Sequence, residues 1–342
     1  MKIVNWGIIG LGNIAYRFSK NFKKVENAKL LAVSSKDDNK LQKFGEEFNI
    51  EKKFLFKDYQ DLVFCDDIDI IYIALPNSLH KKWVLQAIEN KKNVLVEKPA
   101  TINFPDAKEI RNSLKKNSIF FSEAFMYRYH PQINSIIKMI KNGKIGRLLS
   151  METCFGINVL SKKKLFFFEK KRKIDPTSRL FNKNLGGGCI LDLGCYPSSF
   201  SLLIGSLINE IKINDLKLVN IFKEIGETGV DIHSSAELLF PSGFTSKIYA
   251  SFKKNLGNKS IIKGEKGSII VNNTWLGGDI ILCDNDNSEQ IIRFDKDKNI
   301  YRYQIEEINK NLINGSYETN FPIMSMEETL INMKIVDDWL NF

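Results

Sequence analysis

The first third of the chain alternates short apolar runs with segments of helical spacing. The apolar runs have the length of strands and occupy Val4–Ile9, residues 30–33, residues 69–75 and Asn93–Val96. Helical spacing follows at residues 14–22, 39–48, 79–89 and 104–115. Strands that are apolar throughout and separated by helices are typical of a parallel sheet with both faces covered. The pattern predicts an α/β domain with a doubly wound, Rossmann-type parallel sheet over residues 1–123.

The rest of the chain has a different pattern. After a predicted helix at residues 132–141, strand-like segments occupy residues 147–155, 211–222, 234–240, 244–252, 260–263 and 268–272. Pro241, Ser242 and Gly243 give a hairpin turn signal between two of these segments. Two more helices are predicted at residues 190–203 and 326–339. Consecutive strands predict a C-terminal α+β domain, residues 124–342, with a large, mainly antiparallel open sheet.

A glycine-rich turn follows the first predicted strand. Its sequence, Gly10-Leu11-Gly12-Asn13-Ile14-Ala15, matches the pattern G-x-G-x-x-A at the start of a helix. Gly10 allows the tight turn, Gly12 lets a pyrophosphate approach the backbone, and the N–H groups of the helix attract the phosphates. The turn predicts a dinucleotide site that includes Gly10, Gly12, Asn13 and Ile14. The alternative is a plain structural turn.

The end of the second predicted strand bears on which dinucleotide binds. Ser34, Ser35 and Lys36 end that strand, and the first carboxylates come only at Asp37 and Asp38. A carboxylate here would receive the ribose 2′-hydroxyl of NAD, whereas a cation and hydroxyls accommodate the 2′-phosphate of NADP. Ser35 and Lys36 therefore favour NADP(H) over NAD(H). The alternative is that Lys36 is a solvated turn residue and that Asp37 reaches the ribose.

Two later segments carry candidate chemistry. Lys98 follows the buried strand Asn93–Val96, and in doubly wound folds the carboxyl ends of strands face the ligand crevice. Asp192 and Tyr196 follow a glycine run at residues 186–188, and their spacing would place them on one face of a helix. The alternatives are a surface ammonium for Lys98 and a glycine cap with an incidental Asp and Tyr.

These motifs occur in the order seen in a known family. They are Gly10 to Ala15, Leu75-Pro76-Asn77-Ser78-Leu79-His80, Glu97-Lys98-Pro99, Glu123 to Arg128, residues 185–197 and Gly229-Val230-Asp231. From end to end, the chain resembles the glucose–fructose oxidoreductase / inositol dehydrogenase (Gfo/Idh/MocA) family of NAD(P)-dependent oxidoreductases. Where many members have His, this chain has Tyr196, which resembles the branch with dihydrodiol dehydrogenase, NADP-linked xylose dehydrogenases and certain ketosugar reductases.

The resemblance implies roles for single residues. Lys98 is implied to be catalytic, and the peptide bond before Pro99 to be cis. Leu75, Pro76, Asn77, His80 and Glu97 are implied to belong to the cofactor site, with Pro76, Asn77 and His80 near the nicotinamide. Arg128 would contact cofactor or substrate, or would brace the domain junction instead.

Two further residues, Arg179 and Asp231, are substrate candidates, and a surface ion pair is the alternative for Arg179. A cluster of Phe166, Phe167 and Phe168 would form a lid or a subunit contact.

Hydride transfer at a carbon needs a matched proton transfer at the substrate oxygen. The pKa of a free Tyr lies near 10, too high for an efficient base at neutral pH, and a nearby ammonium lowers it. We therefore predict Tyr196 as general acid/base and Lys98 as its electrostatic partner and a donor to the substrate oxygen. Asp192 would orient the substrate or pair with Lys98.

Composition excludes several other classes of protein. The 342 residues carry a formal net charge of +10, but the basic residues are spread along the chain without a groove-reading motif, so no nucleic-acid partner is predicted. Five Cys without a C-x-x-C pair and three His predict neither a disulfide framework nor a metal site. No apolar run approaches the roughly 20 residues of a membrane span, and no signal-peptide pattern precedes Val4, so a cytoplasmic location is predicted.

Together these observations predict an NADP-dependent oxidoreductase that acts on a sugar or a cyclic diol or polyol. A homodimer or homotetramer formed through the C-terminal sheet is expected from the resemblance. One alternative is a reductase of a nucleotide-linked ketosugar. Another, of a different class, is a non-catalytic NADP-binding regulatory protein, although such a protein would not need Lys98, Asp192 and Tyr196.

Overall fold

The computed structural model describes residues 2–164, 168–286, 288–295 and 299–342. Its contacts divide the chain into two compact units. The first unit comprises residues 1–101, 105–130 and 296–329, and the second comprises residues 102–104, 131–295 and 330–342. The predicted boundary between the two domains, at residue 123, stays a prediction. The structure adds that a late segment of the chain belongs to the first unit.

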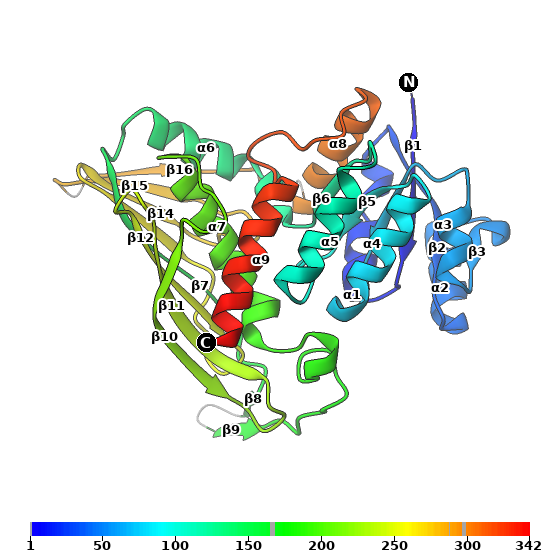
Figure 1. Ribbon diagram of the computed structural model, residues 1–342, viewed down its shortest axis with the longest axis horizontal. Coiled ribbons are helices and arrows are strands. Elements are labelled where there is room, and N and C mark those ends of the chain that lie inside the picture. The colour runs from blue at the N-terminus through cyan, green and yellow to red at the C-terminus, as the bar shows by residue number, and fades with distance from the viewer. Residues whose placement is uncertain (1, 165–167, 287, 296–298) are drawn as a thin grey trace. The chain divides into compact units, whose positions relative to one another are not determined.

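The first unit is built on a parallel sheet of six strands (Figure 1). The strands are β1 (Val4–Ile9), β2 (Ala28–Ser34), β3 (Leu55–Phe56), β4 (Ile70–Ile73), β5 (Asn93–Val96) and β6 (Phe121–Glu123). Their order is β3-β2-β1-β4-β5-β6, and every pair is parallel. This order is that of a doubly wound dinucleotide-binding sheet. The predicted Rossmann architecture is therefore confirmed.

Helices connect these strands and cover the sheet. They are α1 (Asn13–Ser19), α2 (Asp38–Phe48), α3 (Tyr59–Phe64), α4 (His80–Glu89) and α5 (Phe104–Leu114). The structure adds α8 (Ile300–Ile313), a helix that the sequence pattern did not predict. Asn309 of α8 accepts a hydrogen bond from the indole Nε1 of Trp6 in β1, at 2.9 Å. A helix from near the end of the chain thus completes the core of the first unit.

The second unit is built on an eight-stranded sheet. Its strands are β7 (Leu148–Gly156), β10 (Lys217–Ile225), β11 (Asp231–Leu239), β12 (Thr245–Ser251), β13 (Ser260–Gly264), β14 (Gly267–Val271), β15 (Ile280–Asp284) and β16 (Glu289–Ile292). The order is β10-β11-β12-β7-β13-β14-β15-β16. Only the pair β7 and β12 is parallel among these described neighbours, so the predicted mainly antiparallel sheet is confirmed. Gly243, with φ of +81°, makes the predicted turn between β11 and β12.

One face of this sheet carries helix α7 (Cys195–Ser206), which packs on β7 and β12. Helix α6 (Pro131–Lys141) precedes the sheet, and α9 (Met326–Asn341) ends the chain. The stretch Lys183–Ser206 is long and apolar enough to cross a membrane, but its most apolar window is wholly buried in the fold, as expected of a core helix. A short two-stranded ribbon joins β8 (Ser161–Lys164) and β9 (Phe168–Lys171). The side chains of the cluster at residues 166–168 lie outside the described part of the chain.

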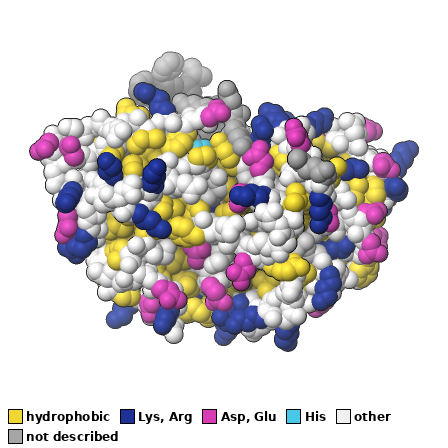
Figure 2. Space-filling model, turned by 90° about the horizontal axis from the view of Figure 1, so that it is seen from above, with side chains coloured by type: hydrophobic (Ala, Val, Ile, Leu, Met, Phe, Trp, Pro, Cys, Tyr) yellow, Lys and Arg dark blue, Asp and Glu magenta, His cyan; other side chains and the backbone are white. Residues whose placement is uncertain are grey.

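Charged side chains are scattered over the surface. On the face drawn in Figure 2, Lys and Arg alternate with Asp and Glu and with apolar side chains, and they do not gather into one basic patch. On this face, the positive charges are thus dispersed rather than concentrated.

Candidate functional site

The predicted cofactor residues of the first unit lie at one edge of its sheet. Gly10 follows β1, Ser35 and Lys36 follow β2, Leu75 follows β4, and Lys98 follows β5. All these strands are parallel, so their carboxyl ends share an edge. The strand order reverses at β1 and β4, and ligands of open α/β sheets bind at such a reversal.

The glycine turn has the geometry that a pyrophosphate requires. Gly10 adopts φ of +92°, and a Cβ there would lie 2.6 Å from the carbonyl oxygen of Ala74, so only glycine fits. Gly12 is exposed directly before α1, and a Cβ on it would meet no described atom within 4 Å. The N-cap residue Gly12 has no side chain that could bond the first N–H groups of α1, and N–H groups at a helix start attract phosphate. The residues present therefore fit a bound dinucleotide phosphate.

The end of β2 bears on whether Lys36 or Asp37 would contact the ribose of the cofactor. The Asp37 carboxylate accepts a hydrogen bond from the Lys40 N–H at 3.1 Å and so caps α2. Its other oxygen lies 3.6 Å from the Lys40 Nζ. Lys36 extends over the ring of Tyr59, with its Nζ 5.7 Å from the ring centre. The carboxylate is thus occupied by the helix start, and Lys36 is the cation beside Ser35.

Tyr59 is a residue that the sequence analysis missed. Burial raises the pKa of its phenol, and a hydrogen bond from the Lys36 backbone opposes that increase. Its ring also packs edge-to-face on Trp83, with ring centres 5.2 Å apart. No local pattern links Tyr59 to Lys36, because Lys36 follows β2 whereas Tyr59 begins α3.

His80 joins two of the strand-end loops. Its ring nitrogens lie 2.8 Å from the carbonyl oxygens of Leu75 and Pro99, and its side chain is fully buried. A carbonyl oxygen only accepts, so a neutral imidazole can donate to one of them at a time. The geometry makes His80 a bridge between the loop after β4 and the loop after β5. Its proximity to a nicotinamide stays a prediction, as do the cofactor contacts of Pro76 and Asn77.

The loop after β5 carries Lys98. The peptide bond between Lys98 and Pro99 is cis, which confirms that prediction. Glu97 accepts a hydrogen bond from the Tyr72 hydroxyl of β4. Lys98 is half-buried, and its ammonium interacts electrostatically with the buried Glu123 carboxylate.

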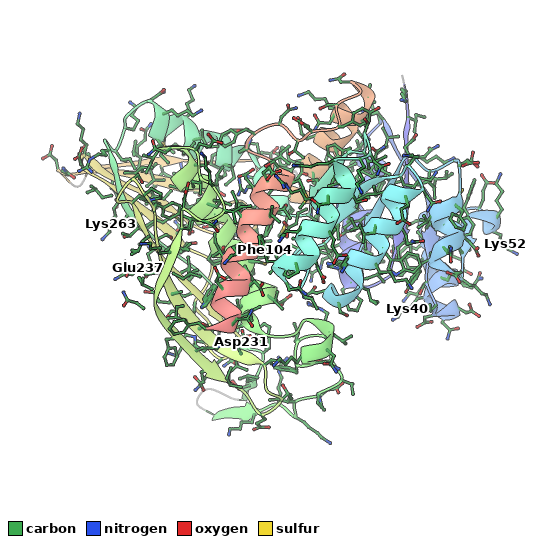
Figure 3. The ribbon with its side chains drawn as sticks, viewed as in Figure 1. Lys40, Lys52, Phe104, Asp231, Glu237 and Lys263 are labelled. Atoms are coloured by element: carbon green, nitrogen blue, oxygen red, sulfur yellow. The ribbon has the colours of Figure 1, made fainter. Side chains whose placement is uncertain are left out.

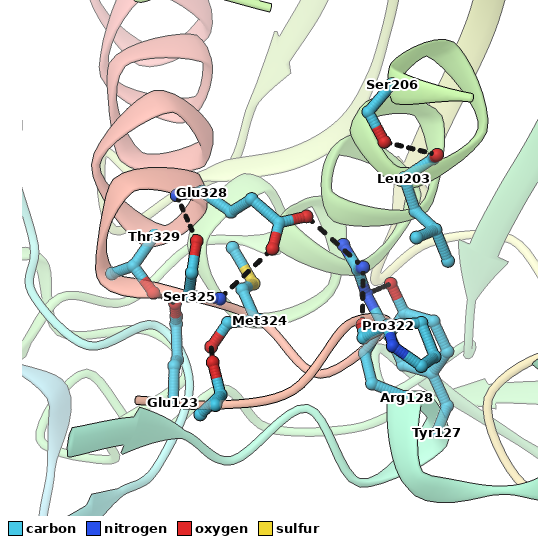
Figure 4. Close-up of polar contacts among 11 residues, drawn as sticks. Glu123, Tyr127, Arg128, Leu203, Ser206, Pro322, Met324, Ser325, Glu328 and Thr329 are labelled. Carbon is cyan, nitrogen blue, oxygen red and sulfur yellow. Dashed lines mark hydrogen bonds and ion pairs between the residues drawn. The ribbon is translucent and has the colours of Figure 1, made fainter. Parts of the chain in front are cut away.

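Arg128 is buried among groups of the first unit (Figure 4). Its guanidinium donates to the Tyr127 hydroxyl and to the Pro322 carbonyl, each at 3.0 Å, and lies 3.4 Å from the Glu328 carboxylate. Its side chain has no exposed surface. These partners brace the segment before α9, whereas a contact of Arg128 with cofactor stays a prediction.

In the second unit, Asp231, which is labelled in Figure 3, lies against Gly188, the last residue of the glycine run. Its carboxylate accepts a hydrogen bond from the Ile190 N–H at 2.6 Å. Gly188 adopts φ of +113°, and a Cβ on it would lie 2.3 Å from an Asp231 oxygen. Burial raises the pKa of Asp231, and the Ile190 N–H opposes that increase. Asp231 therefore caps the start of the helical segment that carries Asp192 and Tyr196, and a substrate contact stays a prediction.

Asp192 lies in a π-helical turn, Ile190–Gly194, directly before α7. The sequence spacing predicted an α-helix here, and the wider turn changes the register between Asp192 and Tyr196. Such π-turns occur frequently at functional sites. The Asp192 carboxylate lies 2.9 Å from the Arg179 guanidinium, whose side chain is 55% exposed while that of Asp192 is 12% exposed. The structure therefore shows an ion pair for Arg179, and a substrate contact of Arg179 stays a prediction.

Tyr196 is held by aromatic neighbours. Its ring centre lies 5.3 Å from that of Phe155 in β7 and 5.4 Å from that of Trp275, and the side chain is 5% exposed. These contacts fix the orientation of the phenol. Lys98 belongs to the first unit and Tyr196 to the second, and their meeting at one substrate stays a prediction.

A cavity of about 510 Å³ opens beside the segment that carries Arg179. Its lining includes Ile174, Phe181, Lys183 and the turn residues Glu227 and Thr228. The sequence analysis did not identify it, because the lining comes from two segments far apart along the chain. Among the described residues, no group of three or more His, Cys, Asp or Glu side chains could hold a metal ion.

Two family models match most of the chain. Residues 4–125 match the model described as "Oxidoreductase family, NAD-binding Rossmann fold". Residues 133–270 match the model described as "GFO/IDH/MocA C-terminal domain". The chain belongs to the Gfo/Idh/MocA family. This membership confirms the predicted resemblance and makes the protein an oxidoreductase with an NAD(P)-binding Rossmann domain.

Other members of the Gfo/Idh/MocA family resemble the chain over most of its length. A trans-1,2-dihydrobenzene-1,2-diol dehydrogenase of Xenopus tropicalis is 26% identical, over 98% of this chain and 96% of that protein. A dTDP-3,4-didehydro-2,6-dideoxy-alpha-D-glucose 3-reductase of Saccharopolyspora spinosa is 26% identical over 80% and 76% of the two chains. The crystal structure of a 3-ketoreductase from Actinomadura kijaniata with NADP and TDP-benzene superposes with a TM-score of 0.81, at 22% identity, over 98% and 96% of the chains. That likeness shows the shared fold.

Proposed function

We propose that the protein is an NADP-dependent oxidoreductase that acts on a carbon of a sugar or of a cyclic diol or polyol. The observation that carries the proposal is that this member of an oxidoreductase family has residue types suited to proton transfer at Lys98, Asp192 and Tyr196. Lys98 follows β5 in the first unit, and Asp192 and Tyr196 lie at the start of the buried helical segment of the second. Relatives named as diol dehydrogenase and ketosugar reductase support the substrate class.

The residues divide the work of the reaction. The bound cofactor supplies or accepts a hydride at C4 of its nicotinamide. The Tyr196 hydroxyl gives a proton to the substrate oxygen during reduction and takes it back during oxidation. The Lys98 ammonium stabilises the phenolate and donates a hydrogen bond to the same oxygen. Asp192, held by Arg179 at 2.9 Å, orients the substrate hydroxyls.

We test the function with a panel of substrates and both cofactor states. We expect loss of NADPH absorbance with keto-sugars or diones, or reduction of NADP with aldoses or cyclic diols. A panel that gives no redox change, from protein that binds NADPH, would contradict the oxidoreductase proposal. That outcome would favour the non-catalytic regulatory protein.

The preference for NADP(H) is supported by the end of β2. Asp37 is engaged by α2, and Lys36 and Ser35 supply the cation and the hydroxyl that a 2′-phosphate would need. In Lys36→Glu, we expect NADPH affinity to fall about tenfold to a hundredfold, because a charged hydrogen bond becomes a repulsion. NADH affinity should change little. Titration of cofactor fluorescence measures both constants.

A charge-matched variant controls this experiment. Lys43 is exposed on α2, so Lys43→Glu makes the same change of charge away from the strand end. Equal weakening of NADPH and NADH by Lys36→Glu would reject the assignment of Lys36 and favour Asp37 as the ribose residue.

A reductase of a nucleotide-linked ketosugar is the second candidate. The cavity lined in part by Lys183 is the observation that favours it, because a cation there would suit a diphosphate. The relative from Saccharopolyspora spinosa is named for such a substrate. Micromolar binding of a dTDP-sugar to the apoenzyme or the NADPH complex would select this candidate.

The outer face of the large sheet supports self-association. Ile261, Ile270, Ile281 and Ile291 pair in register across β13 to β16, on the face opposite the buried Ile262 and Ile269. Ile291 is 47% exposed. Glu237 and Lys263, labelled in Figure 3, lie on the same face. An apolar row on an exposed sheet face fits the formation of a homodimer or homotetramer. We also propose a cytoplasmic location.

A further inference from the structure

A buried carboxylate stands next to the strand that carries Lys98. Glu123 ends β6, and it pairs with Val96, the last residue of β5, in the parallel sheet. The Glu123 side chain is 2% exposed. Buried carboxylates are rare unless they are bonded, so its contacts indicate what it does.

Each oxygen of the Glu123 carboxylate has a hydrogen-bond partner. Oε1 accepts from the Ala100 N–H at 2.9 Å, and Ala100 is separated from Lys98 only by Pro99. Oε2 accepts from the Thr329 hydroxyl at 2.9 Å, in the first turn of α9 (Figure 4). The carboxylate thus joins the backbone just after Lys98 to Thr329, a residue of the first unit that is distant in the sequence.

Burial and the groups around Glu123 shift the pKa of its carboxyl in opposite directions. Burial raises its pKa to about 7, while the hydrogen bonds from Ala100 and Thr329 and the charges of Arg128 and Lys98 favour the ionised form. Arg128 shares its charge with Glu328, at 3.4 Å. The Arg128 guanidinium and the Lys98 ammonium therefore interact more favourably with the ionised form of Glu123 than with the protonated form.

The Glu123 carboxyl can gain or lose a proton while it keeps its hydrogen bonds to Ala100 and Thr329. The Thr329 hydroxyl can donate to the ionised form or accept from the protonated form, because a hydroxyl does both. The Ala100 N–H only donates, and Oε1 can accept from it in either state. Ionisation therefore changes the charge beside Lys98 while the backbone after Pro99 stays bonded.

We propose that Glu123 is a positioning residue for Lys98, which holds the Pro99–Ala100 backbone with its carboxylate and fixes the ammonium through its negative charge. The ionised state is the active one, so turnover rises with pH through neutrality. This inference rests on the proposed function, in which Lys98 serves the proton transfer.

The pH profile of turnover tests this role. In the wild-type enzyme we expect kcat to rise about tenfold between pH 6 and pH 8, as a single ionisation near pH 7 requires. Glu123→Gln keeps an oxygen for Ala100 and an amide donor for Thr329 but carries no charge. We expect its kcat to stay near the low-pH value across this range, with KM for NADPH within about twofold of wild type.

A second variant moves the ionisation instead of removing it. Thr329→Val removes a hydrogen bond that favours the ionised carboxylate, so the rising limb should shift to higher pH. Thr319→Val is the matched control. Thr319 lies in the segment before α9, and its hydroxyl donates a hydrogen bond to the Met324 carbonyl at 3.2 Å. The control should leave the limb in place.

The outcomes separate this inference from the proposed function. A rising limb that persists in Glu123→Gln overturns the role of Glu123, while turnover by the wild type still supports the function. A wild-type enzyme that turns over none of the panel overturns the function, and with it this inference. The positioning role is established if Glu123→Gln removes the rise of kcat with pH and Thr329→Val shifts that rise to higher pH.

Discussion

Replacing Tyr196 with Phe is expected to lower kcat about 10²–10⁴-fold while the protein still folds and binds NADPH. Phe keeps the ring that packs between Phe155 and Trp275, at 5.3 and 5.4 Å, so only the hydroxyl is lost. Without it, the substrate oxygen has no positioned proton donor. Steady-state kinetics and a cofactor titration on the same preparation measure both properties.

Tyr249→Phe is the matched control for this variant. Tyr249 lies half-buried on β12 of the same sheet, so its substitution removes a hydroxyl from the second unit without touching α7. Its kcat should equal that of the wild type. Near-normal turnover by Tyr196→Phe would reject Tyr196 as the general acid/base, and the proposed reaction would then lack its proton donor.

Replacing Lys98 with Ala is expected to reduce kcat by a similar factor, about 10²–10⁴-fold, because Lys98 is proposed to work through Tyr196. The double variant Lys98→Ala/Tyr196→Phe should then lose little more than the worse single variant, since residues that act as a unit are not additive. Kinetics of all four proteins complete the cycle. Added ethylammonium should restore part of the activity of Lys98→Ala.

Multiplicative losses in this cycle would show that Lys98 and Tyr196 act independently. Lys115→Ala, an exposed change after α5, controls for the loss of a positive charge in the first unit. The cycle is the direct test of whether residues from the two units serve one proton transfer.

Much of the fold could be predicted because its signals are local. The apolar run Val4–Ile9 appears as β1 with the same bounds, and Asn93–Val96 appears as β5. The turn at residues 241–243 was also predicted from a short motif and is confirmed. In each of these cases, a few neighbouring residues determine the backbone, so no knowledge of the rest of the molecule is needed. The cis bond before Pro99 was implied by the family resemblance and is confirmed as well.

Other elements lacked such a signal. β16 (Glu289–Ile292) is exposed along most of its length, so its sequence shows no buried alternation and was not predicted. The helical segment from Ile190 to Gly205 is buried on all sides, so its apolar pattern could not distinguish a π-turn from an α-helix. α8 joins the first unit through contacts such as that of Asn309 with Trp6, a pairing between opposite ends of the chain.

By itself, the sequence determined the family, the two sheets, the glycine turn and the residue types available for hydride and proton transfer. Tertiary structure alone decided what each polar group bonds to. It placed Asp37 on α2, Asp231 under the glycine run, Arg179 on Asp192 and Glu123 between Ala100 and Thr329. The reason is physical: a strand or turn follows from adjacent residues, whereas the partner of a buried charge follows from which distant segments pack around it.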